Sequence, residues 1–169
     1  MVELPFDCES NPRWRLLEAA RDQLAAASSL EEVIGIVRAS ARHVVSADGV
    51  TFVLRDGNNC HYVDEDAIAP LWKGQKFPMS SCISGWAMIN NQTAVIPDVF
   101  ADPRIPHDVY RQTFVKSMVM APVGLATPVA AIGAYWRDKP VISERETAAV
   151  EAIAAMVGEA MARGKFAAA

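Results

Sequence analysis

Cysteine and strongly basic segments are both scarce in this sequence. The three cysteines, Cys8, Cys60 and Cys82, are too few and too scattered for a disulfide framework. A reducing compartment is therefore expected. Sixteen basic residues against twenty acidic residues give a net charge of −4, which argues against nucleic-acid binding by neutralisation of phosphates. We expect no nucleic-acid partner.

A secretion signal and long apolar runs are also missing. The first twelve residues are acidic and lack the charged start and apolar stretch of a signal peptide. No stretch is an unbroken run of about 18 apolar residues, so no membrane span or membrane partner is predicted. The composition, 51% hydrophobic and 21% charged, favours a packed core over disorder. We expect a cytoplasmic protein with an N-terminal extension at 1–12, a single domain at 13–164 and a frayed tail at 165–169.

Capping signals predict three of the helices. Asn11-Pro12 places a cap residue and a proline at the start of a helix that runs to about residue 27. Ser29–Glu32 and Ser143–Glu146 each have the pattern of a capping box, in which a serine and a glutamate three residues later satisfy each other's backbone amides. Apolar residues follow both boxes at helical spacing. A short helix is expected over Ile83–Ile89.

The strands are expected to run consecutively, as in hairpins, rather than to alternate with long helices. Residues 64–79 remain ambiguous, with a helical turn at 67–72 as one alternative, and Asp64-Glu65-Asp66 is interpreted as a solvated acidic turn. This order predicts an α+β fold in which helices pack against an antiparallel sheet. The predicted strands are Val50–Leu54, Cys60–Val63, Thr93–Pro97, Ser117–Val123 and Val129–Arg137.

Three motifs in the middle of the chain resemble those of a GAF domain. They are residues 82–87 (CISGWA), 95–98 (VIPD) and 102–104 (DPR). The resemblance covers about residues 14–163, and its central part looks most like GAF domains associated with bacterial sensor histidine kinases. It implies a GAF-like six-stranded antiparallel sheet with helices packed on one face and a ligand pocket with a lid on the other.

The resemblance implies a non-catalytic sensory or regulatory module of bacterial signal transduction. Such a module would bind an unidentified small molecule and pass ligand-induced changes through its terminal helices to a histidine kinase or another signalling output. It would form a homodimer through those helices, which carry alanine-rich stripes. The stripe residues are Ala19, Ala20, Ala27, Ala149, Ala154 and Ala160.

Two other functions remain open. One is a thiol-dependent redox enzyme of the free methionine sulfoxide reductase type, and the other is a degenerate GAF fold that only dimerises. Residues 98–116 contain no cysteine, whereas the lid of those reductases carries a catalytic cysteine and bilin-binding GAF domains attach their cofactor to one there. The signature of cyclic-nucleotide-binding GAF domains is absent too, so no cofactor is named.

The predicted lid is the long connection over residues 98–116, a length that is usually functional in compact domains. Arg104 or His107 would supply a polar contact to the ligand, with a preference for an anionic group. Pairing of Arg104 with Asp102 or Asp108 is the alternative. The apolar wall of the pocket is expected to consist of Trp86, Phe100, Tyr110, Phe114, Met118 and Trp136.

Cys82 is the candidate redox residue, because a helix N-terminus favours a thiolate. The alternative is a small buried hydrophobic residue. We favour the alternative because no second cysteine lies nearby in the sequence to resolve an oxidised thiol. The cysteines and histidines lack the short spacing of zinc ligands, so no metal is expected. Gly85 and Gly133 are expected to be packing positions rather than parts of a phosphate loop.

Overall fold

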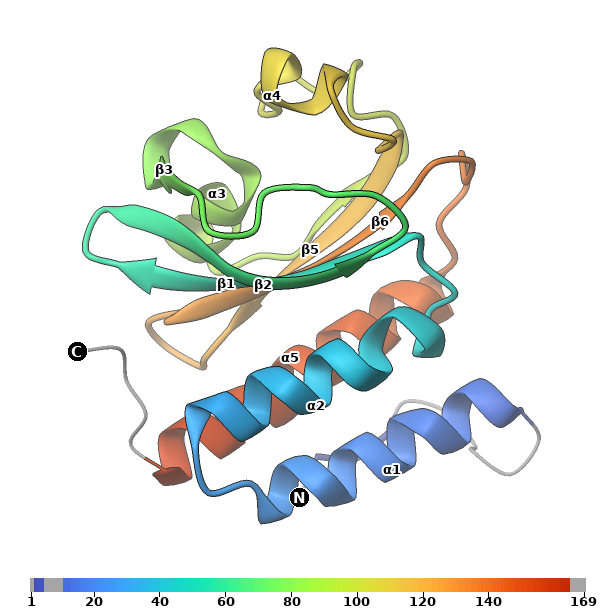
Figure 1. The fold of residues 1–169 in the computed structure, drawn as a ribbon, viewed down its shortest axis with the longest axis vertical. Helices are drawn as coiled ribbons and strands as arrows, with labels where there is room; N and C mark the ends of the chain where they lie inside the picture. Colours follow the sequence, from blue (N-terminus) through green and yellow to red (C-terminus); the bar gives the residue numbers. More distant parts are fainter. Residues whose placement is uncertain (1, 5–10, 165–169) are drawn as a thin grey trace.

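A six-stranded antiparallel sheet lies between two layers of helices in the computed structural model, which describes residues 2–4 and 11–164 (Figure 1). The strand order is β3-β2-β1-β6-β5-β4, so the α+β fold predicted from the sequence is confirmed. The expected tail at 165–169 and Cys8 lie outside the described residues. The elements are α1 (Pro12–Ala26), α2 (Leu30–Val44), β1 (Gly49–Asp56), β2 (Asn59–Ala67), β3 (Lys76–Pro78), the 3₁₀ turn η1 (Met79–Ser81), α3 (Ile83–Asn90), β4 (Ala94–Ile96), α4 (His107–Arg111), β5 (Ser117–Val123), β6 (Ala130–Trp136) and α5 (Glu144–Gly164).

The helix starts follow the capping signals of the sequence. The Asn11 side chain accepts a hydrogen bond from the Arg13 N–H, with Pro12 at the first helical position. The box at Ser143 is closed in both directions, because Glu146 N donates to the serine Oγ and Ser143 N donates to the Glu146 carboxylate. These bonds satisfy amides that have no partner within a helix.

The box at the start of α2 is closed in only one direction. Glu32 N donates to Ser29 Oγ at 3.1 Å, as predicted. The Glu32 carboxylate instead accepts from the backbone N–H of Ser28 at 2.8 Å, one residue before the expected partner. The helix still begins at Leu30.

The predicted strands are present, and β2 is longer than expected. It runs to Ala67, which pairs with Gly49 of β1, so a helical turn at 67–72 is wrong. The expectation of a solvated acidic turn at 64–66 is also wrong, because these residues belong to β2. The register of β2 against β1 shifts by one residue: Tyr62 faces Val53, whereas Asp64 faces Phe52. Such a bulge reverses the alternation of side chains between the two faces.

The two faces of the sheet carry separate hydrophobic cores. α2 and α5 cover one face, and α1 lies outside them as a further layer (Figure 1). Residues 68–77, α3 and the segment with α4 lie over the other face. None of the helices within 2–4 and 11–164 is long and apolar enough to cross a membrane.

The alanine stripes of the terminal helices are used mostly inside the chain. Ala20 and Ala27 are buried on the helical side of the molecule, as are Ala149, Ala154 and Ala160 of α5. The small side chains let α1, α2 and α5 pack closely, and only Ala19 of the six predicted stripe residues is exposed.

Gly85 is a packing position that tolerates no side chain. A Cβ at this residue would lie 1.9 Å from the carbonyl oxygen of Met79 in η1. Gly85→Ala should therefore lower the free energy of unfolding by about 3 kcal/mol, because backbone rather than a flexible side chain must move. Urea denaturation measures this change.

Gly35→Ala in α2 is the matched control. A Cβ there would meet only the end of the Arg38 side chain at 3.9 Å, so helix propensity should raise stability by up to about 1 kcal/mol. Equal effects of the two substitutions would contradict the close approach of α3 to η1.

Candidate functional site

The predicted lid lies over the sheet face opposite α2 and α5, and its two ends are bound together. Val99 N donates to the carbonyl of Lys116 at 2.9 Å, and Lys116 N donates to the carbonyl of Trp136 at 2.9 Å. The segment between them contains α4 and closes on itself like an Ω-loop. It is therefore attached to the sheet at its base.

Three of the expected wall residues fill the space beneath the lid. Tyr110 and Met118 are 2% and 0% exposed, and the Tyr110 hydroxyl donates to the Met118 sulfur at 3.5 Å. The Phe114 ring approaches Gly49 so closely that a Cβ there would lie 3.0 Å from it. These side chains pack onto the sheet instead of lining an open cavity.

Four aromatic rings form the interior of this face. Trp72 is at the centre, with ring centroids at 4.7 Å from Tyr110, 5.5 Å from Tyr135 and 5.6 Å from Tyr62. Burial raises the pKa of all three tyrosines, so their hydroxyls stay protonated at neutral pH. The Tyr135 hydroxyl is 2.8 Å from Thr51 Oγ1, and that of Tyr62 is 3.0 Å from Ser84 Oγ.

Sequence reasoning missed Trp72 and Tyr62 as members of this cluster. The alternation of Cys60 and Tyr62 in a predicted strand could have placed Tyr62 on a buried face. Trp72 gave no such signal, because its position is determined by a carboxylate seven residues earlier.

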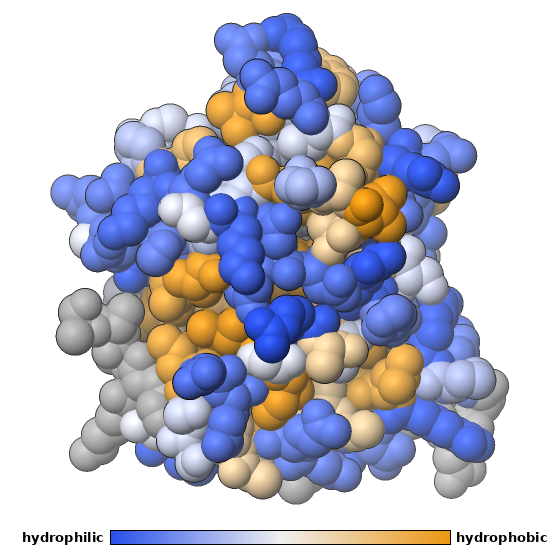
Figure 2. Space-filling view, viewed as in Figure 1, coloured by the Kyte–Doolittle hydropathy of each residue, from blue (hydrophilic) through white to orange (hydrophobic). Residues whose placement is uncertain are grey.

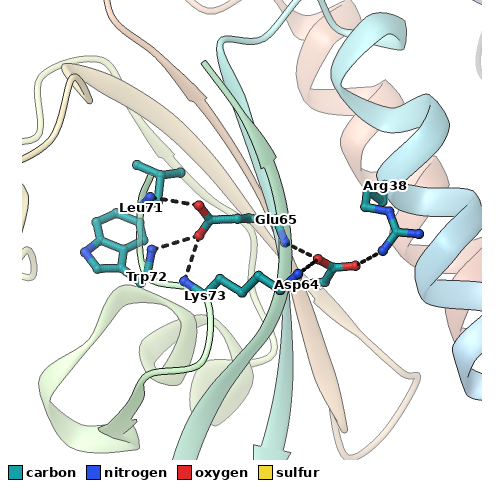
Figure 3. A network of polar contacts seen from close by, with 6 residues as sticks. All are labelled: Arg38, Asp64, Glu65, Leu71, Trp72 and Lys73. Carbon is teal, nitrogen blue, oxygen red and sulfur yellow. Dashed lines mark hydrogen bonds and ion pairs between the residues drawn. The ribbon is translucent and has the colours of Figure 1, made fainter. Parts of the chain in front are cut away.

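Glu65 holds the loop that carries Trp72. Its carboxylate accepts hydrogen bonds from three successive backbone N–H groups, those of Leu71 at 2.8 Å, Trp72 at 2.8 Å and Lys73 at 2.7 Å (Figure 3). Charge-assisted bonds of this kind are stronger than bonds between neutral groups. The loop between β2 and β3 thus has its own anchor on the strand before it.

The neighbouring carboxylate, that of Asp64, lies on the other side of the sheet, because adjacent side chains of a strand alternate between its faces. The bulge after Tyr62 decides which of the two carboxylates takes which side. Asp64 extends towards α2, where Arg38 lies at 2.6 Å, and Lys73 contacts it at 3.0 Å (Figure 3). Burial alone would raise the pKa of Asp64, but hydrogen bonds from Lys73 and Glu65 N and the charges of Arg38 and Lys73 outweigh it and lower the pKa. Two adjacent carboxylates therefore connect the loop to both α2 and the sheet.

The polar residues predicted for the ligand come together around Asp102. Arg104 donates to its carboxylate from Nε at 3.0 Å and from a terminal nitrogen at 2.7 Å, and the Trp86 ring lies 4.3 Å from the guanidinium. His107 Nε2 is 2.9 Å from the Asp102 carbonyl, and its ring contacts Phe100.

The charge of Arg104 is thus engaged within the chain. A hydrogen bond from Arg104 lowers the pKa of Asp102 despite its partial burial. Asp108, the other alternative partner, pairs with Arg111. Of the two alternatives raised by the sequence, the structure shows the pairing of Arg104 with Asp102.

Trp136 does not join the other predicted wall residues. Side chains alternate along β6, so Tyr135 faces the lid while Trp136 packs in the core beneath α2 and α5. Its indole N–H donates to the carbonyl of Ser46 at 3.0 Å. The expectation that Trp136 lines the pocket is wrong for this reason.

Open space lies at the rim of the lid face. A hollow of about 430 Å³ separates the loop of residues 70–77 from α4. Its lining consists of Pro70, Leu71, Trp72, Gln75, Phe77, Asp108, Val109, Gln112 and Thr113.

A second groove, of about 950 Å³, lies between the turn joining β5 to β6 and the C-terminal half of α5. Figure 2 shows apolar residues in this part of the surface, surrounded by hydrophilic ones. It is on the helical side of the sheet and shares no lining residue with the hollow at the lid.

Cys82 has a partner that its sequence neighbourhood does not show. Its Sγ is 3.2 Å from that of Cys60, 22 residues earlier in the chain, and both cysteines are buried and free. The burial fits the interpretation that we favoured, but the argument from a missing second cysteine is wrong. Within the described ranges, no three His, Cys, Asp or Glu side chains are grouped as metal ligands would be.

A family model described as GAF domain matches residues 27–162. The chain belongs to the GAF domain family. The match covers α2 to α5 and leaves out only α1 among the elements. No curated protein sequence matches this GAF domain.

Solved structures share the fold at low sequence identity. A free methionine-R-sulfoxide reductase from Neisseria meningitidis, in complex with its substrate, matches with a TM-score of 0.78 and 16% identity over 98% of each chain. The GAF domain of an Acinetobacter phosphoenolpyruvate-protein phosphotransferase matches with a TM-score of 0.77 and 13% identity, over 92% of this chain and 96% of that one.

The chromophore-binding domain of a bacteriophytochrome from R. palustris matches with a TM-score of 0.74 and 14% identity, over 92% of this chain and 63% of that one. At such identities the likeness shows the fold alone, because one fold carries many functions. The chemistry of this GAF domain has to be argued from its own residues.

Replacing Glu65 tests the anchor of the Trp72 loop. Glu65→Gln keeps one acceptor oxygen but turns an amide NH₂ towards a backbone N–H, so at least one N–H loses its partner. We expect a loss of about 2 kcal/mol in the free energy of unfolding and faster hydrogen exchange at residues 71–73. Glu159→Gln, at an exposed position of α5, should change neither, and equal behaviour of the two variants would contradict the anchor.

Acid should weaken the contact between β2 and α2. The pKa of Asp64 is lowered in the folded state, so its stabilisation is present above its unfolded pKa of about 4 and is lost as the pH falls through the lower folded value. We expect Asp64→Asn to be less stable than wild type at pH 7 and to lose less stability between neutral and strongly acidic pH. Urea denaturation over that range measures this, and parallel curves for the two proteins would contradict it.

Proposed function

We propose that this GAF domain is a non-catalytic sensory or regulatory module of bacterial signal transduction, which binds a small molecule in the hollow between residues 70–77 and α4. GAF domains commonly bind small molecules in signalling. The observation that carries the proposal is the construction of this hollow: both of its walls are short segments that rest on the sheet, and its lining includes Trp72, the central ring of the aromatic cluster, and Phe77. Ligand sites typically combine such aromatic surface with a few polar groups.

The lining favours a neutral ligand with a planar ring. Trp72 and Phe77 offer aromatic surface, and Gln75 and Gln112 offer amide donors and acceptors. No lysine or arginine lines the hollow, and its one carboxylate, that of Asp108, is paired with Arg111. Arg104, the predicted anion contact, is engaged by Asp102. The proposal therefore replaces the anionic ligand expected from the sequence with an uncharged one.

A continuous set of hydrogen bonds supports transmission to the terminal helices. At the base of the lid, the backbone N–H of Lys116 donates a hydrogen bond to the carbonyl of Trp136. The indole N–H of Trp136 in turn donates to the carbonyl of Ser46, just after α2. Arg13 of α1 donates to the Ser46 side chain at 2.9 Å. Movement of the lid would in this way displace α1 and α2 relative to the sheet.

The domain would pass its signal on as a homodimer, to a partner such as a histidine kinase. Because most stripe alanines are buried within the chain, the dimer would use the outer face of α1, where Leu16 is 43% exposed and Ala19 is accessible. Light scattering at micromolar concentration measures the mass of the assembly, and Leu16→Glu should convert a dimer into a monomer. A wild-type protein that is already monomeric would contradict the dimer.

Blocking the hollow tests ligand binding. Mass spectrometry of the purified protein, followed by thermal-shift and tryptophan-fluorescence titration with nucleosides, cyclic nucleotides, free methionine sulfoxide and biliverdin, should reveal one compound that stabilises the domain. Val109→Trp fills the hollow and should abolish that shift, whereas Val141→Trp, at a position 78% exposed, should leave it unchanged. A shift that survives Val109→Trp, or no shift with any compound, would contradict this site.

The alternative enzymatic function has a specific observation in its favour, the contact between Cys60 and Cys82. A free methionine-R-sulfoxide reductase is among the structures of the same fold. Turnover of free methionine sulfoxide that disappears in Cys82→Ser would establish this function in place of the sensory one. The absence of cysteine from residues 98–116 favours the sensory one.

A further inference from the structure

Two thiols meet at the N-terminus of α3. Cys60 is on β2 and is 0% exposed, whereas Cys82 is the N-cap residue of α3 and is 7% exposed. Their sulfur atoms are 3.2 Å apart, about 1 Å more than a disulfide bond length. Formation of that bond requires the two sulfur atoms to approach each other by this difference.

The surroundings of Cys82 differ from those of an inert buried cysteine. The Ser84 hydroxyl donates to its sulfur at 3.3 Å and is itself 3.0 Å from the Tyr62 hydroxyl. The contact with Cys60 lowers the pKa of Cys82, burial opposes this effect, and the Ser84 hydroxyl and the Gly85 N–H add to it. The same contact, together with burial, raises the pKa of Cys60.

The two cysteines therefore have different roles available to them. Cys82 is the more acidic and the more accessible, which are the properties of the thiol that an oxidant meets first. Cys60 keeps its proton and lies behind it, within reach of the oxidised sulfur. A reactive thiol next to a resolving one is the arrangement of a redox site.

We propose that Cys60 and Cys82 form a hydroperoxide-responsive dithiol site that converts reversibly to an intramolecular disulfide. In the first step the Cys82 thiolate attacks one oxygen of hydrogen peroxide, the O–O bond breaks, Cys82 becomes a sulfenic acid, and hydroxide leaves and is protonated to water. In the second step the Cys60 sulfur attacks that of Cys82, the S–O bond breaks, and the Cys60 proton leaves with the hydroxyl as a second water molecule.

The pair thus gives two electrons to one molecule of peroxide. A dithiol reductant returns them by thiol–disulfide exchange, in which its own two thiols become a disulfide. Neither step requires a compound to be bound in the small-molecule hollow.

The disulfide would act on the segment that forms one wall of that hollow. The covalent loop from Cys60 to Cys82 contains Glu65, Trp72 and the whole connection between β2 and β3. Closing this loop restricts the unfolded chain and joins β2 to the start of α3. Oxidation would thereby raise the melting temperature and reduce the opening of residues 68–77.

Oxidation of the full chain by hydrogen peroxide tests the proposal. The reduced protein is desalted and treated with a modest excess of peroxide, free thiols are then alkylated, and the products are analysed as intact protein and as peptides. We expect one added alkyl group, on Cys8, together with a loss of two hydrogens, a peptide that links Cys60 to Cys82, and full recovery of both thiols with dithiothreitol. Cys8→Ser is the matched control and should behave as wild type.

Variants of the pair separate the two steps. In Cys60→Ala, Cys82 should be oxidised about tenfold more slowly near pH 6.5, because the hydrogen bond that stabilises its thiolate is gone. Its sulfenic acid should persist long enough to be trapped by dimedone. In Cys82→Ala, Cys60 should remain reduced.

Peptide mapping of the wild-type protein decides the matter even where a variant fails to fold. Oxidation confined to Cys8, a disulfide between chains only, or full alkylation of Cys60 and Cys82 after peroxide treatment would overturn the proposal. None of these three outcomes bears on the binding of a compound in the hollow, which Val109→Trp tests separately.

Discussion

Three successive backbone N–H groups bound by one carboxylate determine how the lid face of this GAF domain is built. Glu65 accepts from residues 71–73 and so satisfies a loop that has no sheet or helix partner for these donors. The bonds place Trp72 over the sheet, where it packs against Tyr62, Tyr110 and Tyr135. The lid then rests on Trp72 through Tyr110, and the hollow at its rim exists because the two segments meet there without interdigitating fully.

The sheet separates two sides that differ in chemistry. The helical side is filled mostly by aliphatic and alanine side chains, with Trp14, Phe52 and Trp136 among them. The lid side contains aromatic rings, hydroxyls and two thiols. A low dielectric strengthens the interactions among these polar groups. Both the proposed ligand hollow and the proposed dithiol site therefore lie on the lid side, and the contacts of Trp136 with Ser46 connect it to the helices.

The fold is shared with proteins that are only 13–16% identical to this chain and that differ in function. The function of this chain has to be argued from its own lid-face side chains. In this chain the lid has no cysteine, its Arg104 and Arg111 are engaged by Asp102 and Asp108, and the two neighbouring thiols are instead on β2 and at the N-cap of α3. A function inferred from the fold alone would miss these differences.

The sequence by itself determined the helix starts, the strands and the antiparallel α+β order, because caps, turns and periodicity act over a few residues. Asn11, Ser143 and Gly85 have the roles that their local patterns indicate. Only the tertiary structure decided the faces and the long-range partners. The bulge in β2 decides that Glu65 faces the loop of residues 71–73 and Asp64 faces α2, alternation in β6 removes Trp136 from the lid, and folding brings Cys60 to Cys82 across 22 residues. Such contacts depend on strand register and on loop paths, which no local pattern encodes.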